Sequence, residues 1–403
     1  MIVRKDNIIK LGLFAYLTAT TIGFASVNDF TLAAIPFVRN LSIFIAIGAL
    51  IYSFSRLTLK VEALAAIVLI VLLYTLGLMR GLGNLNYINY MSALGVSFFI
   101  VVTGALYFSN FRSAAAQVPV AAYFLLLAIC VVIILIATRG LILAGIPRFN
   151  FDIMSSRGGE VSYSQGVSKF FGLACIASIW LLGNVKRRSG KTILLVLFVG
   201  FFGISFLGGG RGDFLALVII IFAMSFSSGW RGALLGAFLG ILLYIIVFEV
   251  LLNASTDLVS AQRFLVLLEG NDFGLRDVLF AESFDLLLSE EGCLFFGCGY
   301  TYFQKYYGYE YGFYPHNIFL EAMIVWGVPL VLMFLVAVVV GFVKRARFDF
   351  LTWIGAYFVL IALKSGDIIG SWFALSFLFF YAGVGVSNLF AAGNSNNWQR
   401  TPE

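Results

Sequence analysis

The chain has 403 residues, of which 61% are hydrophobic and only 11% are charged. A soluble protein cannot bury that much apolar surface, so the composition excludes a soluble domain and indicates a polytopic membrane protein. The net charge of +6 does not indicate nucleic-acid binding, because the basic residues lie mostly in short connections between apolar runs.

Apolar windows of about 18 residues or more predict twelve membrane spans, with both termini on the same side of the membrane. They form a single all-α membrane domain over residues 1–403, which ends in a polar tail at 391–403. The predicted spans lie near 8–25, 37–55, 61–79, 89–107, 118–138, 166–184, 192–208, 213–229, 232–252, 317–343, 350–366 and 368–390.

The distribution of basic residues predicts the orientation. With the N-terminus in the cytoplasm, 15 of the 26 Lys and Arg residues fall on the cytoplasmic side, as the positive-inside rule requires. Both long loops, 139–165 and 253–315, then face away from the cytoplasm. Apolar residues at helical spacing predict short helices on the membrane surface in the second loop: Leu258, Phe264, Leu267 and Leu268, then Val278, Leu279, Phe284, Leu287 and Leu288.

Arg211 lies in the glycine-rich turn 208–213, on the same extracytoplasmic side. Glycines let the backbone approach a ligand closely, and successive N–H groups in such a turn can form an anion-binding nest. The alternative is a helical hairpin whose arginine reaches the lipid head groups. Because ionisable residues beside a span are costly, we expect a functional role for Arg211.

Arg263 and Arg276 lie in the second long loop, which is acidic overall. If they point toward the membrane, two guanidinium groups can grip a diphosphate through paired hydrogen bonds. They can equally well pair with the nearby acidic residues Glu269, Asp272 and Asp277 on a solvated face, where ion pairs contribute little. The sequence leaves both interpretations open. Arg157, in the first long loop, is a weaker candidate that can line an acceptor site or can equally be a solvated loop residue.

His316 is the only histidine in the chain, and therefore the only side chain that ordinarily titrates near neutrality. Pro315 favours a helix start, which predicts His316 and Asn317 in the first turn of a span, where free N–H groups attract phosphate. Asn317 and Glu321 are four residues apart and share a face of that helix. His316 can be a structural interfacial residue, but its position favours a base that takes the proton of an attacking hydroxyl.

No metal site or cofactor is predicted, because one histidine and scattered carboxylates offer no ligand spacing, and no phosphate-binding loop is present. Cys130 and Cys175 lie in predicted spans. Cys293 and Cys298 lie in the extracytoplasmic loop, where they can form a disulfide or remain free.

These residues together resemble the O-antigen polymerase and O-antigen ligase superfamily of bacterial membrane proteins. The motifs cover about the second half of the chain, and the number of predicted spans covers all of it. One departure is Trp326-Gly327-Val328-Pro329, where the family often has a second glycine. The matching segments are Gly210-Arg211-Gly212, Arg263-Phe264, Gly274-Leu275-Arg276, the run from Phe296 to Phe303, Pro315-His316-Asn317 with Glu321, and Gly327.

The resemblance implies a C-type glycosyltransferase fold in the bacterial inner membrane, with an inverting reaction on the periplasmic face that needs neither metal nor nucleotide sugar. The donor would be an undecaprenyl-diphosphate-linked glycan. Arg211 and Arg276, with Arg263 as a further candidate, would hold the diphosphate, and His316 would activate the acceptor hydroxyl. Asn317, Glu321, Arg157 and Tyr300 would contact the substrates.

The acceptor decides between the two activities of the superfamily. A polymerase joins lipid-linked repeat units, and a ligase transfers the glycan to lipid A-core. The tyrosine-rich stretch 300–314 suits stacking on sugar rings and favours the polymerase, with a chain-length-regulating membrane protein as a possible partner. The alternative from another class is a transporter of lipid-linked oligosaccharides, which predicts broken helices and charges within the membrane.

Overall fold

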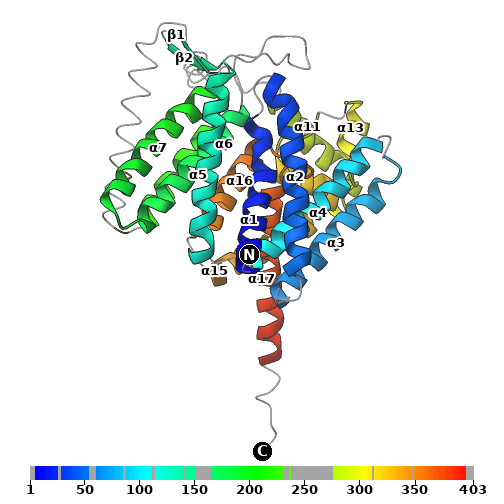
Figure 1. Ribbon diagram of the computed structural model, residues 1–403. Helices are drawn as coiled ribbons and strands as arrows, with labels where there is room; N and C mark the ends of the chain where they lie inside the picture. The colour runs from blue at the N-terminus through cyan, green and yellow to red at the C-terminus, as the bar shows by residue number, and fades with distance from the viewer. Residues whose placement is uncertain are drawn as a thin grey trace, which may run out of the picture. The chain divides into compact units, whose positions relative to one another are not determined.

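The computed structural model describes residues 5–25, 29–53, 60–84, 88–110, 114–138, 141–144, 146–149, 165–227, 229, 236, 276–310, 313–345 and 349–395. These residues are helical apart from one small hairpin and the connecting turns (Figure 1). Nine of the described helices are long and apolar enough to cross a membrane, which confirms a polytopic membrane protein. Of the predicted span 232–252, only Gly236 is among the described residues.

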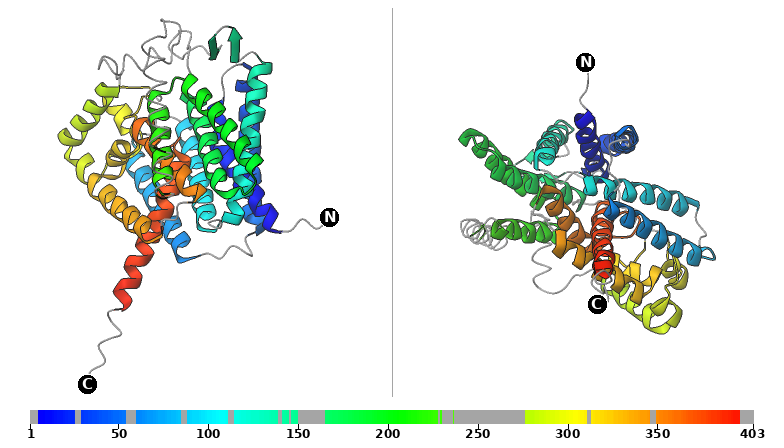
Figure 2. Two further views of the ribbon diagram at one scale, coloured as in Figure 1. Left: turned by 90° about the vertical axis from the view of Figure 1, so that its left-hand side faces the viewer. Right: turned by 90° about the horizontal axis from the view of Figure 1, so that it is seen from below.

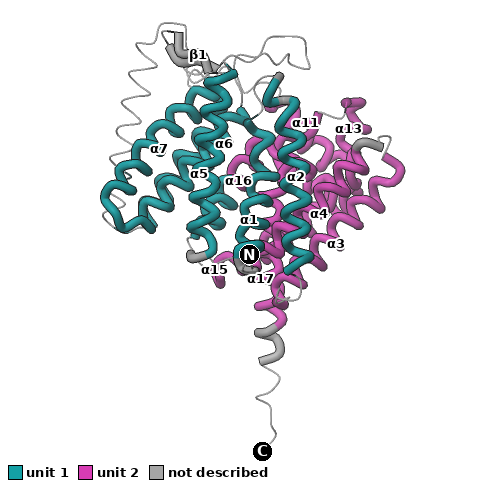
Figure 3. The backbone as a smooth tube through the Cα atoms, in the orientation of Figure 1, with its two compact units in different colours: residues 1–55, 113–273, 348–357 teal, residues 56–112, 274–347, 358–403 magenta. Residues whose placement is uncertain are grey.

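The chain divides into two compact units, each assembled from separate stretches of sequence (Figure 3). Unit 1 comprises residues 1–55, 113–273 and 348–357, and unit 2 comprises residues 56–112, 274–347 and 358–403. The helix α16, Phe350–Ser365, contributes to both.

Helix α6 is the core of unit 1, because it is buried along most of its length and packs against α5, α7 and α8. Gly166 at its start lies against the backbone of Phe24, so a side chain there would collide with that carbonyl. The elements of unit 1 are α1 (Lys5–Thr21), η1 (Ile22–Ala25), α2 (Asp29–Ser53), α5 (Ala114–Ala137), β1 (Leu141–Ala144), β2 (Ile146–Phe149), α6 (Gln165–Asn184), α7 (Arg188–Leu207) and α8 (Arg211–Ser227).

Helix α17 is the core of unit 2 and packs against α3, α4 and α15. Gly341 and Gly385 let the backbones of α15 and α17 approach closely, as small residues do between membrane helices. Besides the end of α16, unit 2 contains α3 (Val61–Gly81), α4 (Ile88–Asn110), α11 (Arg276–Ser289), α12 (Glu291–Phe295), α13 (Tyr302–Tyr307), α14 (Ile318–Trp326), α15 (Val328–Arg345) and α17 (Trp372–Ser395).

Two features differ from the expected all-helical set of uninterrupted spans. Residues 141–149 form an antiparallel hairpin of two short strands, with Leu141 opposite Phe149, just beyond the end of α5 (Figure 2). The predicted span 317–343 is wrong as a single helix, because Gly327 separates α14 from α15. The backbone of Gly327 has φ 91° and ψ 149°, which lie outside the helical region and favour glycine.

Three helix ends that the predicted topology puts on the cytoplasmic side contact one another in unit 2. The Lys60 side chain at the start of α3 donates to the Ser109 carbonyl at the end of α4, at 3.3 Å. Glu62, also at the start of α3, forms an ion pair with Arg345 at the end of α15. The helices of this unit therefore alternate in direction as the predicted spans require.

Candidate functional site

Helix ends that the predicted topology puts on the extracytoplasmic side also contact one another in unit 2. Asn84, just after α3, donates to the Cys298 carbonyl at 3.1 Å. The Tyr314 hydroxyl donates to the Ser365 carbonyl at the end of α16, at 3.3 Å. The end of the second long loop and the turn between α16 and α17 therefore share one region of this unit.

A disulfide shapes the approach to this region. Cys293 and Cys298 are bonded, with their Cα atoms 4.8 Å apart. Beyond the disulfide, the backbone N–H of Cys298 donates to the Ile324 carbonyl at 2.7 Å, and that of Gly299 donates to Val325 at 3.2 Å. The sequence left the pairing of these two cysteines open, and the structure bonds them to each other.

Tyr300 is not available to a substrate. Its side chain is fully buried, with ring centroids 6.3 Å from Tyr74 and 6.0 Å from Tyr90. Gly77 and Gly81 on α3 leave the space it occupies, since a Cβ at Gly77 would lie 2.7 Å from the Tyr300 ring. The prediction that Tyr300 binds substrate is therefore wrong, because this tyrosine is part of the packing between α3 and the loop.

The start of α14 differs from the expected arrangement. Helix α14 begins at Ile318, and Asn317 is its N-cap, with its side-chain oxygen accepting from the N–H groups of Phe319 at 2.9 Å and Leu320 at 3.2 Å. These N–H groups are therefore already bonded within the protein and do not bind phosphate as expected. The cap also occupies the side-chain oxygen of Asn317 that was expected to orient a substrate.

His316 precedes the cap and has a left-handed backbone, with φ 53°. A residue other than glycine at this angle is uncommon, and such conformations concentrate at functional sites. The imidazole packs on the Tyr314 ring with centroids 4.1 Å apart and an interplanar angle of 46°. The backbone conformation thus directs the only histidine to a fixed aromatic neighbour.

Tyr314 connects His316 to the charged residues of the site. Burial raises the pKa of the Tyr314 phenol, the carboxylates of Asp367 and Glu321 raise it further, and the guanidinium of Arg276 lowers it. All three charges are therefore close enough to act on one hydroxyl group. Arg276 is half-buried at the first position of α11.

Glu321 and Asp367 form an acid pair at the inner end of this site. Glu321 is 8% exposed, and its Oε2 accepts from the Ile368 N–H at 2.8 Å. Asp367 accepts from the Gly370 N–H at 2.9 Å through Oδ1. Both carboxylates therefore accept backbone N–H groups of the turn between α16 and α17.

Arg211, in unit 1, is the first residue of α8 and is half-buried. The expected anion nest in front of it is not formed. The N–H groups of Gly208, Gly209 and Gly210 donate to the Ile204 carbonyl, the Phe206 carbonyl and the Ser168 hydroxyl. These three N–H groups are therefore already bonded within the protein.

The structure groups some of the predicted residues and not others. It brings together His316, Glu321 and Arg276 in unit 2, and it adds Tyr314 and Asp367, which were not predicted. An ionisable residue between two apolar runs could have pointed to Asp367. Arg157 and Arg263 lie outside the described residues. Among the described residues, no group of three histidine, cysteine or acidic residues is arranged to hold a metal ion.

Comparison of the chain with known protein families, with characterised proteins and with solved structures found no match.

Proposed function

We propose that the protein is a surface-polysaccharide polymerase that joins undecaprenyl-diphosphate-linked repeat units on the periplasmic face of the bacterial inner membrane. The observation that carries the proposal is Tyr314, whose ring packs on His316 and whose hydroxyl lies within reach of the charges of Arg276, Glu321 and Asp367. A base and a cation within one region are what glycosyl transfer from a diphosphate requires.

In the proposed reaction, His316 and Arg276 each have one role. The acceptor hydroxyl attacks the anomeric carbon of the donor, His316 takes the hydroxyl proton, and the bond from carbon to the diphosphate oxygen breaks. Arg276 stabilises the negative charge that develops on the departing diphosphate. Because Asn317 already accepts the N–H groups of Phe319 and Leu320 at the start of α14, this charge is left to the Arg276 side chain. Arg211 is a second candidate for the same role.

An aromatic ladder on unit 2 supports a sugar substrate. We define it as Tyr306, Tyr307, Tyr309 and Phe313, in which the ring of Tyr309 stacks on Tyr307 at 5.8 Å and on Phe313 at 5.3 Å. Tyr306, packed edge-on against Tyr307, is 43% exposed. Glu282 fixes the ladder by accepting from the Tyr309 hydroxyl at 2.7 Å. Exposed aromatic faces with polar edges suit the apolar face of a sugar ring.

A transporter of lipid-linked oligosaccharides is the second candidate, because two features favour it. The helix break at Gly327 and the buried carboxylate of Glu321 are both typical of membrane transporters. In a proton-coupled transporter, Glu321 would carry the proton and His316 would be dispensable.

The test uses the purified full-length protein with an undecaprenyl-diphosphate-linked repeat unit as the only substrate. A polymerase gives a ladder of longer lipid-linked glycans, which is lost in His316→Ala and reduced about 10²-fold or more in Arg276→Ala, as for other groups that stabilise developing charge. Arg188→Ala is the matched control, because Arg188 is exposed at the start of α7. This variant should still form the ladder of longer lipid-linked glycans.

Other outcomes identify the alternatives. Transfer only after lipid A-core is added would indicate the ligase. No product with either acceptor, together with lipid flipping that survives His316→Ala and is lost in Glu321→Gln, would refute the enzyme and establish the transporter.

A further inference from the structure

A groove between α1 and α5 in unit 1 is separate from the residues discussed above. Its volume is about 540 Å³, within the size range of small-ligand pockets. The two helices run side by side and in the same direction (Figure 2). Leu11, Tyr123 and Leu126 line the groove and are 51%, 49% and 58% exposed, so it is open along its length.

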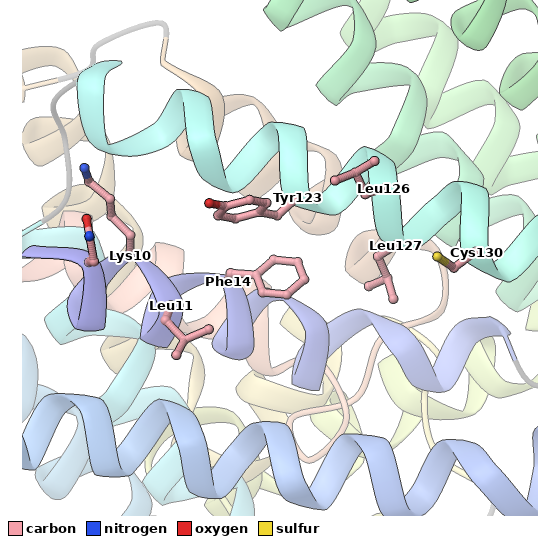
Figure 4. A pocket seen from close by; sticks show the side chains of 8 residues that line it. Lys10, Leu11, Phe14, Tyr123, Leu126, Leu127 and Cys130 are labelled. Carbon is pink, nitrogen blue, oxygen red and sulfur yellow. The ribbon is translucent and has the colours of Figure 1, made fainter. Parts of the chain in front are cut away.

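The polar and apolar groups of the groove are segregated. Lys10 and the hydroxyl end of Tyr123 lie toward one end, whereas Leu126, Leu127 and Cys130 lie toward the other (Figure 4). Phe14 forms part of the wall and packs on the Tyr123 ring, with centroids 5.8 Å apart. The groove thus has one cationic end and a continuous apolar length.

The polar end lies where the head group of a cytoplasmic-leaflet lipid would be. Lys10 is in the second turn of α1, and Tyr123 is in the first half of α5, which begins at Ala114. The positive-inside distribution puts the N-terminal ends of both helices on the cytoplasmic side. From Tyr123 to Cys130 the helix rises about 10 Å, so the apolar end extends well into the hydrocarbon region.

We infer that this groove binds one anionic phospholipid of the cytoplasmic leaflet, with its phosphate at Lys10 and an acyl chain along Phe14, Leu126 and Cys130. The ammonium group of Lys10 complements the negative head group, and a half-buried lysine holds its charge in a fixed place on an apolar wall. The apolar lining complements the acyl chain.

Photo-crosslinking of the full-length protein tests the inference directly. The protein is reconstituted in bilayers of phosphatidylcholine that contain a trace of phosphatidylglycerol with a photoreactive group in its acyl chain. Crosslinked positions are then mapped by mass spectrometry. We expect crosslinks at Leu126, Leu127 and Cys130 that excess unlabelled phosphatidylglycerol removes and excess phosphatidylcholine does not. Val196 on α7, which is 67% exposed, reports ordinary lipid contact and should show no such preference.

Two variants distinguish a site from general attraction to the membrane. Lys10→Gln should lower the groove crosslinks about fivefold, the effect expected for one basic residue near a membrane surface. Lys191→Gln, which removes an exposed lysine at the start of α7, should leave them unchanged. Leu126→Trp, which fills the groove, should remove the crosslinks at Cys130 and leave those at Val196.

Any of three results would overturn the inference. Both lipids could compete equally for the groove, or the crosslinking yield in the groove could equal that at Val196. The third result is an unchanged preference for phosphatidylglycerol in Lys10→Gln. Gel filtration of each variant establishes that it is folded before its crosslinks are compared.

Discussion

The cap at the start of α14 separates a structural role from a catalytic one. Asn317 accepts two backbone hydrogen bonds, at 2.9 and 3.2 Å, and it follows His316 directly. Asn317→Ala leaves both N–H groups without this acceptor and should lower the free energy of unfolding by about 0.5 to 2 kcal/mol, the range measured for N-caps. Asn317→Ser keeps an acceptor at the same place and should restore most of that loss.

Activity should follow stability in these two variants. If Asn317 acts only by holding the helix start, the Ala variant should lose less than about 30-fold in polymerising activity, since the upper limit of about 2 kcal/mol corresponds to a factor of about 30. Loss of a group that contacts the reacting atoms instead lowers the catalytic rate about 10²- to 10³-fold. Unfolding in mixed micelles, followed by tryptophan fluorescence, measures the free energy of unfolding. The rate at which the glycan ladder forms measures the activity.

The opposite pattern would refute the structural role. A loss of about 10²-fold in Asn317→Ala, with unchanged unfolding and no recovery in Asn317→Ser, would mean that the amide contacts the substrate after all.

Two further predictions concern buried residues of the same unit. Tyr300→Ala should lower the free energy of unfolding by about 3 to 5 kcal/mol, as for other large aromatic residues in cores. Tyr300→Phe removes a buried hydroxyl for which the described residues offer no hydrogen-bond partner of good geometry, so it should cost less than about 1 kcal/mol and keep full activity. A large activity loss in a stable Phe variant would restore a substrate role. Glu321→Ala leaves the Ile368 N–H without its acceptor and should lower the free energy of unfolding by about 1 to 3 kcal/mol, the cost of an unsatisfied buried donor. Glu321→Gln keeps an oxygen acceptor and should recover most of that loss, whereas equal losses in both variants would contradict this role.

The apolar runs predicted most of the membrane helices closely, because burial in lipid leaves a strong signal in any window of about 18 residues. The predicted spans 61–79 and 166–184 correspond to α3 at Val61–Gly81 and α6 at Gln165–Asn184. The same averaging concealed the break at Gly327, since hydropathy does not report a single backbone angle.

The residue types of the site could be predicted, but their roles could not. A glycine-rich turn and a helix start both appeared suited to anions, yet oxygens of the protein already accept their N–H groups. They are two backbone carbonyls and the Ser168 hydroxyl in the turn, and the Asn317 side chain at the helix start. Tyr300 belongs to a tyrosine-rich stretch whose other described tyrosines are partly exposed, and only the folded chain shows that α3 covers it.

The contacts between α3 and the second half of the chain have a consequence for assembly in the membrane. Arg80 and Asn84 bond to Trp326, Cys298 and Lys305, which lie 246, 214 and 221 residues later in the sequence. At a synthesis rate of about 5 to 20 residues per second, the end of α3 waits roughly 10 to 50 s for these partners. During that time lipid or another helix must cover Gly77 and Gly81. Unit 2 is therefore completed by its last-made helices, long after α3 itself has been inserted.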